Sequence, residues 1–279
     1  MVLVKTIKEV KELVNKWKSE GQSIGLVPTM GYLHEGHKSL IERSVKENDR
    51  TIVSVFVNTI QFGPNEDLAT YPRDIESDKK LCESVGADLI FNPEPDEMYG
   101  DRFCTHVDMS ILTEDLCGAS RPGHFRGVQT VVLKLFNIVM PNKAYFGEKD
   151  AQQLAVIKRM VEDLNVNVEI VGCPIVREAD GLAKSSRNTY LSKEEREAAT
   201  IINKALTIGK ELIKNGERDT KTVVDKITAV INSEPMANIE YIKIVDLLTI
   251  KPVEKIEGSV LCAAAVRFGT TRLIDNFSI

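Results

Sequence analysis

The sequence predicts an α/β protein in which a parallel sheet with helices on both faces is followed by a smaller α+β domain. Three observations lead to this fold class. Up to about residue 177, short apolar runs alternate with segments of helical spacing. One of these runs, 51–57, is β-branched and almost wholly apolar, as buried parallel strands tend to be. Beyond residue 187, two helical segments precede three strand-like runs. We therefore predict two domains, 1–177 and 178–279.

The first predicted domain begins with a helix over 6–20, because Thr6 and Glu9 form a capping-box pattern. A strand follows at 24–27, and then a helix that carries apolar residues at Leu40, Ile41 and Val45. Residues 96–123 receive no assignment. The remaining elements are predicted as a strand at 51–57, an irregular stretch at 58–73, a helix at 74–85, a strand at 89–91, a helix at 127–139, a strand at 144–146, a helix at 150–164 and a strand at 166–176.

The second predicted domain begins with helices. Ser192 and Glu195 form a capping signal for a helix that continues to about Gly216, and a second helix covers 219–232. Three strands follow, predicted at 239–245, 260–266 and 272–275. Helices followed by strands indicate a small α+β domain.

Composition limits the possible functions. The formal net charge of −5 argues against a broad surface for nucleic acid or for an anionic membrane. The five cysteines are odd in number and follow no pairing motif, which favours a reducing cytoplasm. The N-terminus lacks the apolar core of a signal peptide, and no stretch reaches membrane-spanning length. We therefore expect a cytoplasmic protein with no nucleic-acid or membrane partner.

The most informative stretch is Pro28-Thr29-Met30-Gly31-Tyr32-Leu33-His34-Glu35-Gly36-His37, which follows the first predicted strand of the sheet. Its two histidines stand three positions apart at a predicted helix start, so the imidazoles should share a face. Free backbone N–H groups and the helix dipole attract anions at that position, which indicates a phosphate site. A zinc pair is the first alternative, although no CxxC is present and the spacing differs from the zincin pattern. A solvated surface turn is the second alternative.

Further polar clusters follow other predicted strands, where ligands of parallel sheets gather. Asn58 and Gln61 could bond the hydroxyls and carboxylate of a substrate, or merely brace their loop. The run Gly147-Glu148-Lys149-Asp150 combines glycine with a mobile cation near a helix start, although a solvated charge run would look the same. The segment 176–188 offers Ser185, Ser186 and Arg187 as a second phosphate clamp. Residues 121–127 concentrate cations and suggest a flap or an interface.

Two familiar nucleotide sites, that of dinucleotide dehydrogenases and that of P-loop NTPases, are disfavoured, because the sequence contains neither G-x-G-x-x-G after the first strand nor G-x-x-x-x-G-K-[ST]. A Rossmann-like sheet that binds its nucleotide with histidines remains. In this respect the chain resembles the HxGH superfamily of nucleotidylyltransferases and class I aminoacyl-tRNA synthetases. The sequences 34–37 and 184–187 stand where the two signatures of that superfamily would stand.

A closer resemblance is to the pantothenate synthetase (pantoate–β-alanine ligase) family. The matching motifs, in family order, are Pro28 to Gly31, His34 to His37, Phe56 to Asn58, Gln61 to Gly63, Tyr71 to Arg73, Arg121 to Phe125, Gly147 to Asp150 with Gln152 and Gln153, Asp180 to Ala183, and Ser185 to Asn188. This resemblance implies an ATP-dependent ligase that joins pantoate to β-alanine through a pantoyl adenylate and releases AMP and pyrophosphate. It also implies a homodimer, Mg²⁺ that arrives with ATP, and a C-terminal domain that closes over the active site of a Rossmann-like N-terminal domain.

The resemblance also implies roles for individual residues. The ATP-binding set would be Met30, Gly31, Tyr32, Leu33, His34, Glu35, Gly36, His37, Gly147, Glu148, Lys149, Asp150, Val176, Lys184, Ser185, Ser186 and Arg187. The catalytic set would be His37, His34, Lys149, Ser185, Ser186 and Arg187, with His37 as the proton donor. Gln61, Gln153 and Asn58 would bind pantoate, and Gln61 would also meet β-alanine. Asp78 is a weak candidate as a protein ligand of Mg²⁺, so no metal residue is assigned.

Two positions depart from the family pattern. Lys184 replaces an apolar residue that is common there, and Cys117 stands where some members carry Glu. Two other functions remain open. The chain could be another HxGH adenylyltransferase that releases pyrophosphate without forming an amide, or a non-catalytic protein that binds ATP. Formation of AMP only when pantoate and β-alanine are both supplied would separate the ligase from these alternatives.

Overall fold

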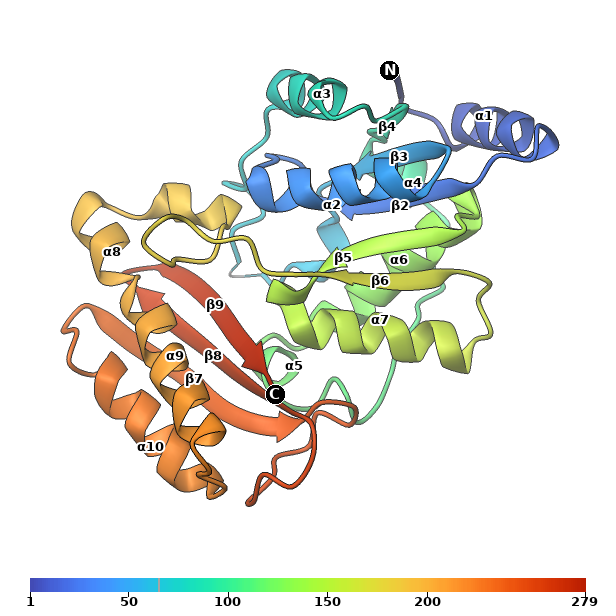
Figure 1. Cartoon of the computed structure of the whole chain (residues 1–279). Coiled ribbons are helices and arrows are strands. Elements are labelled where there is room, and N and C mark those ends of the chain that lie inside the picture. The colour runs from blue at the N-terminus through green and yellow to red at the C-terminus, as the bar shows by residue number, and fades with distance from the viewer. Residues whose placement is uncertain (65) are drawn as a thin grey trace. The chain divides into compact units, whose positions relative to one another are not determined.

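The computed structural model describes residues 1–64 and 66–279, so Asn65, within the stretch predicted as irregular at 58–73, lies outside the described residues (Figure 1). Contacts divide the chain into two compact units. The first unit comprises 1–109, 121–148 and 156–174, and the second comprises 110–120, 149–155 and 175–279. The predicted single boundary between residues 177 and 178 stays a prediction. In the described part of the chain, no helix has the length and apolarity that crossing a membrane requires.

A six-stranded parallel sheet forms the centre of the first unit. Its strands are β1 (Val2–Val4), β2 (Ile24–Thr29), β3 (Arg50–Val55), β4 (Leu89–Phe91), β5 (Lys143–Gly147) and β6 (Glu169–Cys173), and their order in the sheet is β1-β4-β3-β2-β5-β6. From β2 the chain proceeds through β3 to β4 on one side and then returns to place β5 on the other side of β2. The order therefore reverses between β2 and β5, and ligands of such sheets bind beyond the carboxyl ends of the strands at that point.

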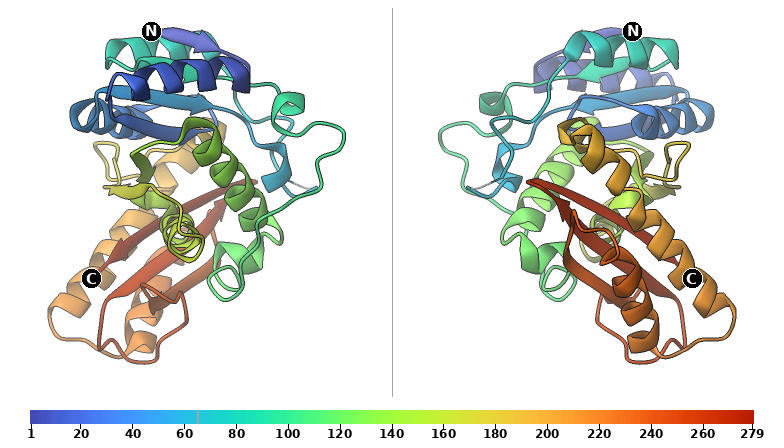
Figure 2. Two further views of the ribbon diagram at one scale, coloured as in Figure 1. Left: turned by 90° about the vertical axis from the view of Figure 1, so that its right-hand side faces the viewer. Right: turned by 90° about the vertical axis from the view of Figure 1, so that its left-hand side faces the viewer.

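Helices cover both faces of this sheet (Figure 2). The helices of the unit are α1 (Ile7–Ser19), α2 (Glu35–Glu47), α3 (Ile75–Ser84), α4 (Pro95–Met98), α6 (His124–Val139) and the later part of α7 (Ala151–Asp163). Helices α2 and α3 pack on the face that presents Val27, Val53 and Ile90. Neighbouring strand residues point to the opposite face, and there α1 packs against α6. These contacts confirm the predicted parallel sheet with helices on both faces.

The second unit is built on a three-stranded antiparallel sheet. Its strands are β7 (Ala237–Asp246), β8 (Val260–Phe268) and β9 (Thr271–Ser278), in the order β7-β8-β9. Its helical segments are α5 (Cys117–Ser120), η3 (Ser186–Tyr190), α8 (Lys193–Ala198), α9 (Ile201–Lys214) and α10 (Thr220–Ile231). An apolar core lies between the sheet and the two longer helices and includes Leu206, Ile227 and Val266. This arrangement confirms the predicted C-terminal α+β part.

Several predicted elements differ from the structure in detail. The edge strand β1 was not predicted, and its pairing with β4 alone is a property of the assembled sheet. The strand predicted at 166–176 forms only at Glu169–Cys173. The helix predicted at 192–216 is two helices, α8 and α9. At that break the Thr200 hydroxyl donates to the carbonyl of Glu197 at 2.8 Å, and no Gly or Pro in the sequence marks the position.

Candidate active site

The turn after β2 is held in place by a carboxylate from α3. Both oxygens of Asp78 accept backbone N–H groups, from Tyr32 at 2.9 Å and from Leu33 at 2.6 Å. Asp78 is 2% exposed, and its burial raises the pKa although the two backbone bonds oppose that shift. Gly31 adopts φ +84°, and a Cβ there would lie 3.0 Å from Asp78 Oδ2 and from Val55 Cγ1. Glycine and a buried acceptor therefore shape the turn that leads into α2.

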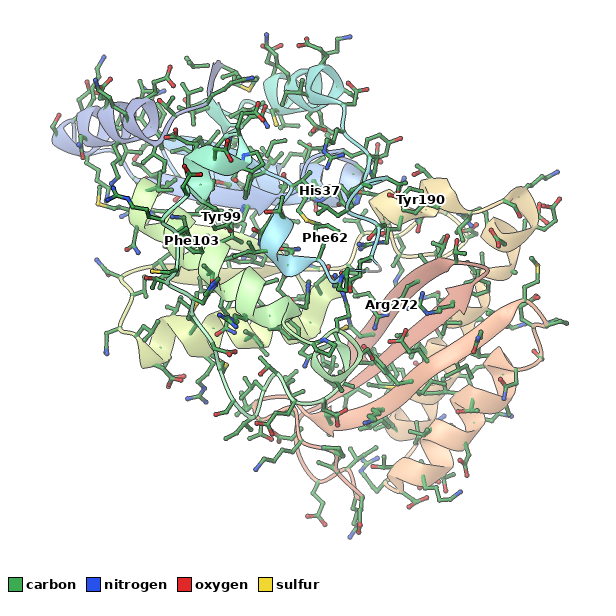
Figure 3. All side chains as sticks on the ribbon, turned by 180° about the vertical axis from the view of Figure 1, so that it is seen from behind. His37, Phe62, Tyr99, Phe103, Tyr190 and Arg272 are labelled. Atoms are coloured by element: carbon green, nitrogen blue, oxygen red, sulfur yellow. The ribbon has the colours of Figure 1, made fainter. Side chains whose placement is uncertain are left out.

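The two histidines of this turn lie together at the start of α2, as predicted. Figure 3 marks His37. His34 is the N-cap residue, its Nδ1 accepts the N–H of Gly36 at 3.1 Å, and Nδ1 of His37 accepts the N–H of His34 at 3.3 Å. The ring centroids are 4.1 Å apart. Because a backbone N–H only donates, both Nδ1 atoms are lone-pair acceptors in this arrangement, and each neutral ring carries its proton on Nε2. The turn thus provides two Nε2–H donors at a helix N-terminus.

The hydrogen bonds of Asn58 fix the orientation of Gln61. Asn58 Nδ2 donates to the carbonyl of Gly127 at 3.1 Å and to Gln61 Oε1 at 2.9 Å. The Tyr99 hydroxyl donates to Asn58 Oδ1 at 2.6 Å. Since a carbonyl only accepts, the side-chain atom of Asn58 that faces the Gly127 carbonyl must be the nitrogen Nδ2. Because Nδ2 only donates, the side-chain atom of Gln61 that faces it must be the oxygen Oε1. The Nε2 of Gln61 therefore points away from Asn58, with Met30 Sδ at 3.3 Å. Gln61 is thus arranged as an N–H donor.

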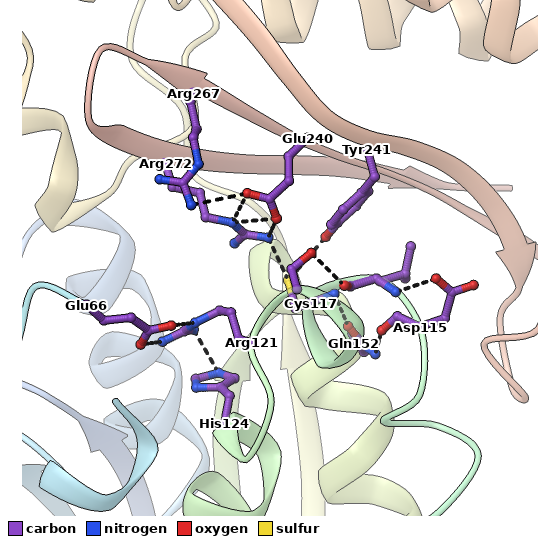
Figure 4. Close-up of polar contacts among 12 residues, drawn as sticks. Glu66, Asp115, Cys117, Arg121, His124, Gln152, Glu240, Tyr241, Arg267 and Arg272 are labelled. Carbon is purple, nitrogen blue, oxygen red and sulfur yellow. Dashed lines mark hydrogen bonds and ion pairs between the residues drawn. The ribbon is translucent and has the colours of Figure 1, made fainter. Parts of the chain in front are cut away.

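A second chain of contacts holds the backbone of Gln61, and its members Glu66, Arg121 and His124 are drawn in Figure 4. Glu66 accepts two hydrogen bonds from Arg121, each 2.6 Å long. Arg121 Nη1 lies 3.0 Å from His124 Nε2, and His124 Nδ1 lies 3.0 Å from the carbonyl of Gln61. A guanidinium only donates, so Nε2 of His124 is the acceptor and Nδ1–H donates to Gln61. Burial acts to raise the pKa of Glu66, but the Arg121 guanidinium outweighs it and lowers that pKa to about 2.

The contacts of Arg121 and His124 give residues 121–127 a definite place within the first unit, where the sequence suggested a flap or an interface. Gly127 belongs to the same arrangement, because a Cβ there would lie 2.5 Å from Gln61 Cα and 2.6 Å from the Ile60 carbonyl. The sequence did not indicate that Glu66, Tyr99 and His124 help to hold Asn58 and Gln61 in place. These residues are distant from Gln61 in the chain or share no motif with it, so only the RPGHF run offered a signal.

The second unit carries most of the other predicted ATP-binding residues. Residues 177 and 183 form an antiparallel bridge, and Ser185 begins a 3₁₀ turn by accepting the N–H of Arg187 at 3.3 Å. The Lys184 ammonium pairs with Glu178 at 2.9 Å, which gives this unusual lysine a carboxylate partner inside its own loop. Lys149 Nζ lies 3.7 Å from Asp150. Val176 stands at the start of the same loop, while Gly147 and Glu148 lie at the carboxyl end of β5 in the first unit.

The adjacent residues Gln152 and Gln153, which follow Lys149, differ in their surroundings. Gln152 is 5% exposed and bonds the backbone of three residues in 112–117, donating to Leu112 and Asp115 and accepting from Cys117. Gln153, the residue predicted to bind pantoate, is half-buried, and adjacent helix positions point about 100° apart. Cys117 Sγ lies 3.1 Å from the Tyr241 hydroxyl (Figure 4). Cys117, which stands where some family members carry Glu, therefore contacts other residues of the second unit.

No metal centre is evident in the described residues. Among residues 1–64 and 66–279, no group of three or more His, Cys, Asp or Glu side chains is arranged to hold a metal ion. Both oxygens of Asp78, the weak candidate, accept backbone N–H groups. A cation that enters with a triphosphate would take most of its ligands from phosphate oxygens and water.

The strand order and the turn with the sequence His34-Glu35-Gly36-His37 define an α/β protein with a Rossmann-like parallel sheet. The sequence profile of the family described as pantoate-beta-alanine ligase matches residues 2–278. The chain is 61% identical over 278 residues to a pantothenate synthetase of Ruminiclostridium cellulolyticum and 60% identical to one of Clostridium acetobutylicum, covering 100% of this chain and 99% of each relative. The chain belongs to the pantoate–β-alanine ligase family.

Solved structures agree with this assignment. A pantothenate synthetase from Thermus thermophilus matches with a TM-score of 0.95 and 44% identity, covering 99% of each chain. A pantoate-beta-alanine ligase from Francisella tularensis matches with a TM-score of 0.80 and 37% identity, covering 99% of this chain and 97% of the other. The Francisella protein was solved in complex with beta-gamma ATP and beta-alanine.

Proposed function

We propose that this chain, a ligase that forms pantothenate, works through a pantoyl adenylate. In the first step a carboxylate oxygen of pantoate attacks the α-phosphorus of ATP, the bond from that phosphorus to the bridging oxygen breaks, and pyrophosphate leaves. In the second step the neutral amine of β-alanine attacks the acyl carbon, AMP leaves and the amine loses a proton. Neither step needs a nucleophile from the protein. The protein's contribution is alignment and stabilisation of developing charge.

The observation that carries the proposal is the pair of imidazoles at the N-terminus of α2. Their Nδ1 atoms accept backbone N–H groups of the turn, which turns both Nε2–H groups into donors for phosphate oxygens. The helix terminus adds a favourable field for anions, and the turn follows β2 where the strand order reverses. His37 would donate to the phosphate as charge develops in the transition state, and His34 would bind beside it.

The orientation of Gln61 supports its proposed contact with pantoate. Its amide presents N–H groups, and the hydroxyl and carboxylate oxygens of pantoate are acceptors. Asn58 would act through Gln61, because both ends of its amide already have partners in the protein. Gln153 would add a second amide for pantoate, and β-alanine would approach Gln61.

The remaining predicted residues complete the proposed ATP set. Lys149, Lys184, Ser185, Ser186 and Arg187 would bind phosphate oxygens and stabilise the charge that moves to pyrophosphate. Residues of the turn at 30–36 would lie along the nucleotide, with Gly147, Glu148, Asp150 and Val176 near ribose and adenine. Mg²⁺ would enter as part of the MgATP substrate. The homodimer and the cytoplasmic location that the family resemblance implies are also proposed.

An omission assay tests the reaction. Purified protein is incubated with MgATP, pantoate and β-alanine, each omitted in turn, while pyrophosphate, AMP and pantothenate are measured. AMP should accumulate only when all three substrates are present. Sustained release of pyrophosphate without amide formation while all three substrates are present would indicate an adenylyltransferase instead, since omission of β-alanine alone still permits the first step of the ligase once per active site. ATP binding without any product would indicate a non-catalytic protein.

The variant His37→Ala tests the assignment of the histidine. It should bind ATP nearly as well as the wild type yet release pyrophosphate about 10²–10⁴-fold more slowly, since the lost contact acts mainly in the transition state. His106→Ala is the matched control, because His106 is exposed and contacts the Phe103 ring. Near-normal turnover of His37→Ala would remove this residue from the mechanism.

A further inference from the structure

Two adjacent residues of β9, Asp275 and Asn276, bond the two segments of the second unit that carry the proposed phosphate ligands. Asp275 accepts from Arg177 Nη1 at 2.6 Å and from Nη2 at 2.9 Å. Asn276 Nδ2 donates to the carbonyl of Lys149 at 2.9 Å. Both side chains are buried, with exposed fractions of 4% for Asp275 and 8% for Asn276. Neither residue belongs to the sets assigned above to ATP or pantoate.

Strand geometry explains how neighbours in sequence reach two different segments. Side chains alternate between the two faces of a sheet. Leu273 and Phe277 belong to the core under α9 and α10, so Asp275 points to that face. Asn276 points to the opposite face, as does Arg272, which contacts Cys117 in the segment 110–120. One short stretch of β9 therefore contacts chain segments on both sides of the sheet.

Arg177 transmits the position of Asp275 to the loop that contains Ser185 and Arg187. Arg177 Nη1 also donates to the carbonyl of Gly181 at 3.1 Å, which closes the turn of a small hairpin. The hairpin is completed by the bond from the N–H of Glu178 to the Leu182 carbonyl at 2.8 Å and by the bond from the N–H of Lys184 to the Val176 carbonyl at 2.9 Å. Ser185 follows immediately, so the hairpin sets where the phosphate-binding turn begins.

The charged pair is better suited to fixing geometry than to adding stability. Removing two charges from water costs about as much as their attraction returns, so a buried ion pair is weak support for stability alone. Its two-pronged geometry, in contrast, fixes the direction of the guanidinium plane. Asn276 likewise fixes a backbone carbonyl rather than the mobile end of Lys149.

We infer that Asp275 and Asn276 are positioning residues for ATP, which orient the loop 177–187 and the backbone of Lys149 without touching the nucleotide. This inference rests on the proposed function, because it uses the phosphate roles assigned there to Lys149, Ser185 and Arg187. Loss of the contact from Asp275 to Arg177, or of the contact from Asn276 to Lys149, should lower the affinity for ATP. The proposed contact of Gln61 with pantoate, in the first unit, should be unaffected.

Two isosteric variants test the inference. Asp275→Asn removes the charge that pairs with Arg177, and Asn276→Asp replaces the donor to the Lys149 carbonyl with an acceptor. Each should raise the KM for ATP and the directly measured Kd for ATP about tenfold, as expected for one disturbed charge-assisted or buried hydrogen bond. In Asp275→Asn, whose partner Arg177 lies outside the segment that carries Gln153, the KM for pantoate should stay within about twofold. Amide exchange at residues 181–187 should accelerate in Asp275→Asn.

Glu240→Gln is the matched control. Glu240 is an ion-paired carboxylate of the same sheet, bound to Arg272 at 2.9 Å and to Arg267 at 3.3 Å, and these partners bond neither Lys149 nor the loop 177–187 in the contacts described (Figure 4). It should lower the melting temperature without changing the Kd for ATP. If Asp275→Asn instead keeps wild-type ATP affinity, or loses affinity for ATP and pantoate equally as a destabilised fold would, the inference is wrong. Failure of the proposed function is recognised separately, because the wild type itself would then form no pantothenate.

Discussion

Tyr99→Phe removes a single oxygen and should report on the orientation of the Gln61 amide, which we propose binds pantoate. The Tyr99 hydroxyl donates to Asn58 Oδ1 at 2.6 Å, and Asn58 is 1% exposed. The ring itself packs against Phe56 and Phe103, with centroids 6.0 Å and 4.8 Å away. Figure 3 labels Tyr99 and Phe103. Phenylalanine preserves this packing, so the variant isolates the hydrogen bond.

The structure sets the magnitude of the expected change. A buried acceptor left without its donor costs about 1–3 kcal/mol, so the free energy of unfolding should fall by that amount. Asn58 keeps its bonds to Gly127 and Gln61, which limits the disorder of the Gln61 amide. We therefore expect the KM for pantoate to rise about fivefold to tenfold, equivalent to about 1–1.4 kcal/mol, and the KM for ATP to stay within about twofold.

Steady-state kinetics with pantoate and ATP varied separately, together with urea unfolding, would measure both effects. Tyr145→Phe is the control, because the Tyr145 hydroxyl accepts from Asn48 at 2.7 Å and donates to Glu47 at 3.0 Å, and neither partner is among the residues proposed to bind pantoate. It should lose stability with an unchanged KM for pantoate. The reasoning fails if both variants change the KM for pantoate equally, or if Tyr99→Phe leaves it at the wild-type value.

Three further predictions concern residues of the first unit. Because Arg121 lowers the pKa of Glu66 from 4.5 to about 2 in the folded state, the stabilisation by this carboxylate is fully present above about pH 4.5 and is lost as the pH falls towards 2. Urea unfolding should therefore show a gap between wild type and Glu66→Gln that is constant at neutral pH and shrinks below about pH 4.5; a gap independent of pH would contradict this. Gly127→Ala should raise the KM for pantoate at least about tenfold, because its Cβ would lie 2.5 Å from Gln61 Cα; kinetics equal to wild type would show that the helix shifts freely. Asp78→Ala should lower the free energy of unfolding by about 1–3 kcal/mol, because two backbone donors lose their acceptor, and a smaller loss on urea unfolding would mean that water replaces the carboxylate.

Local patterns in the sequence predicted the parts of the site that depend on neighbouring residues. The histidine turn follows from a strand end, a glycine and a helix start within ten positions, and the paired rings were expected from their spacing. The fold class followed in the same way from the alternation of strand and helix patterns. Strand order, by contrast, is a property of the assembled sheet, and no local pattern places β5 beside β2.

Contacts between distant residues were not predictable from the sequence. Asn58 is braced by Tyr99, which lies 41 positions away, and Arg177 is held by Asp275 at a separation of 98 positions. Residues 110–120 and 149–155 belong with the second unit because Asp115, Cys117 and Gln152 bond to one another or to β7. No local pattern in the sequence marks these contacts.

Some groups can only donate a hydrogen bond and others can only accept one. In this protein such groups fix the tautomers of histidines and the orientations of side-chain amides. Backbone N–H groups make acceptors of Nδ1 in both turn histidines, a backbone carbonyl makes a donor of Asn58 Nδ2, and a guanidinium makes an acceptor of His124 Nε2. In the turn and in Gln61 the result is an N–H group that can donate to the proposed ligand. This arrangement suits a chain with a net charge of −5 whose proposed substrates, ATP and pantoate, are anions. Neutral N–H groups fixed in advance can select acceptor oxygens without a broad positive surface, which would also attract unrelated polyanions.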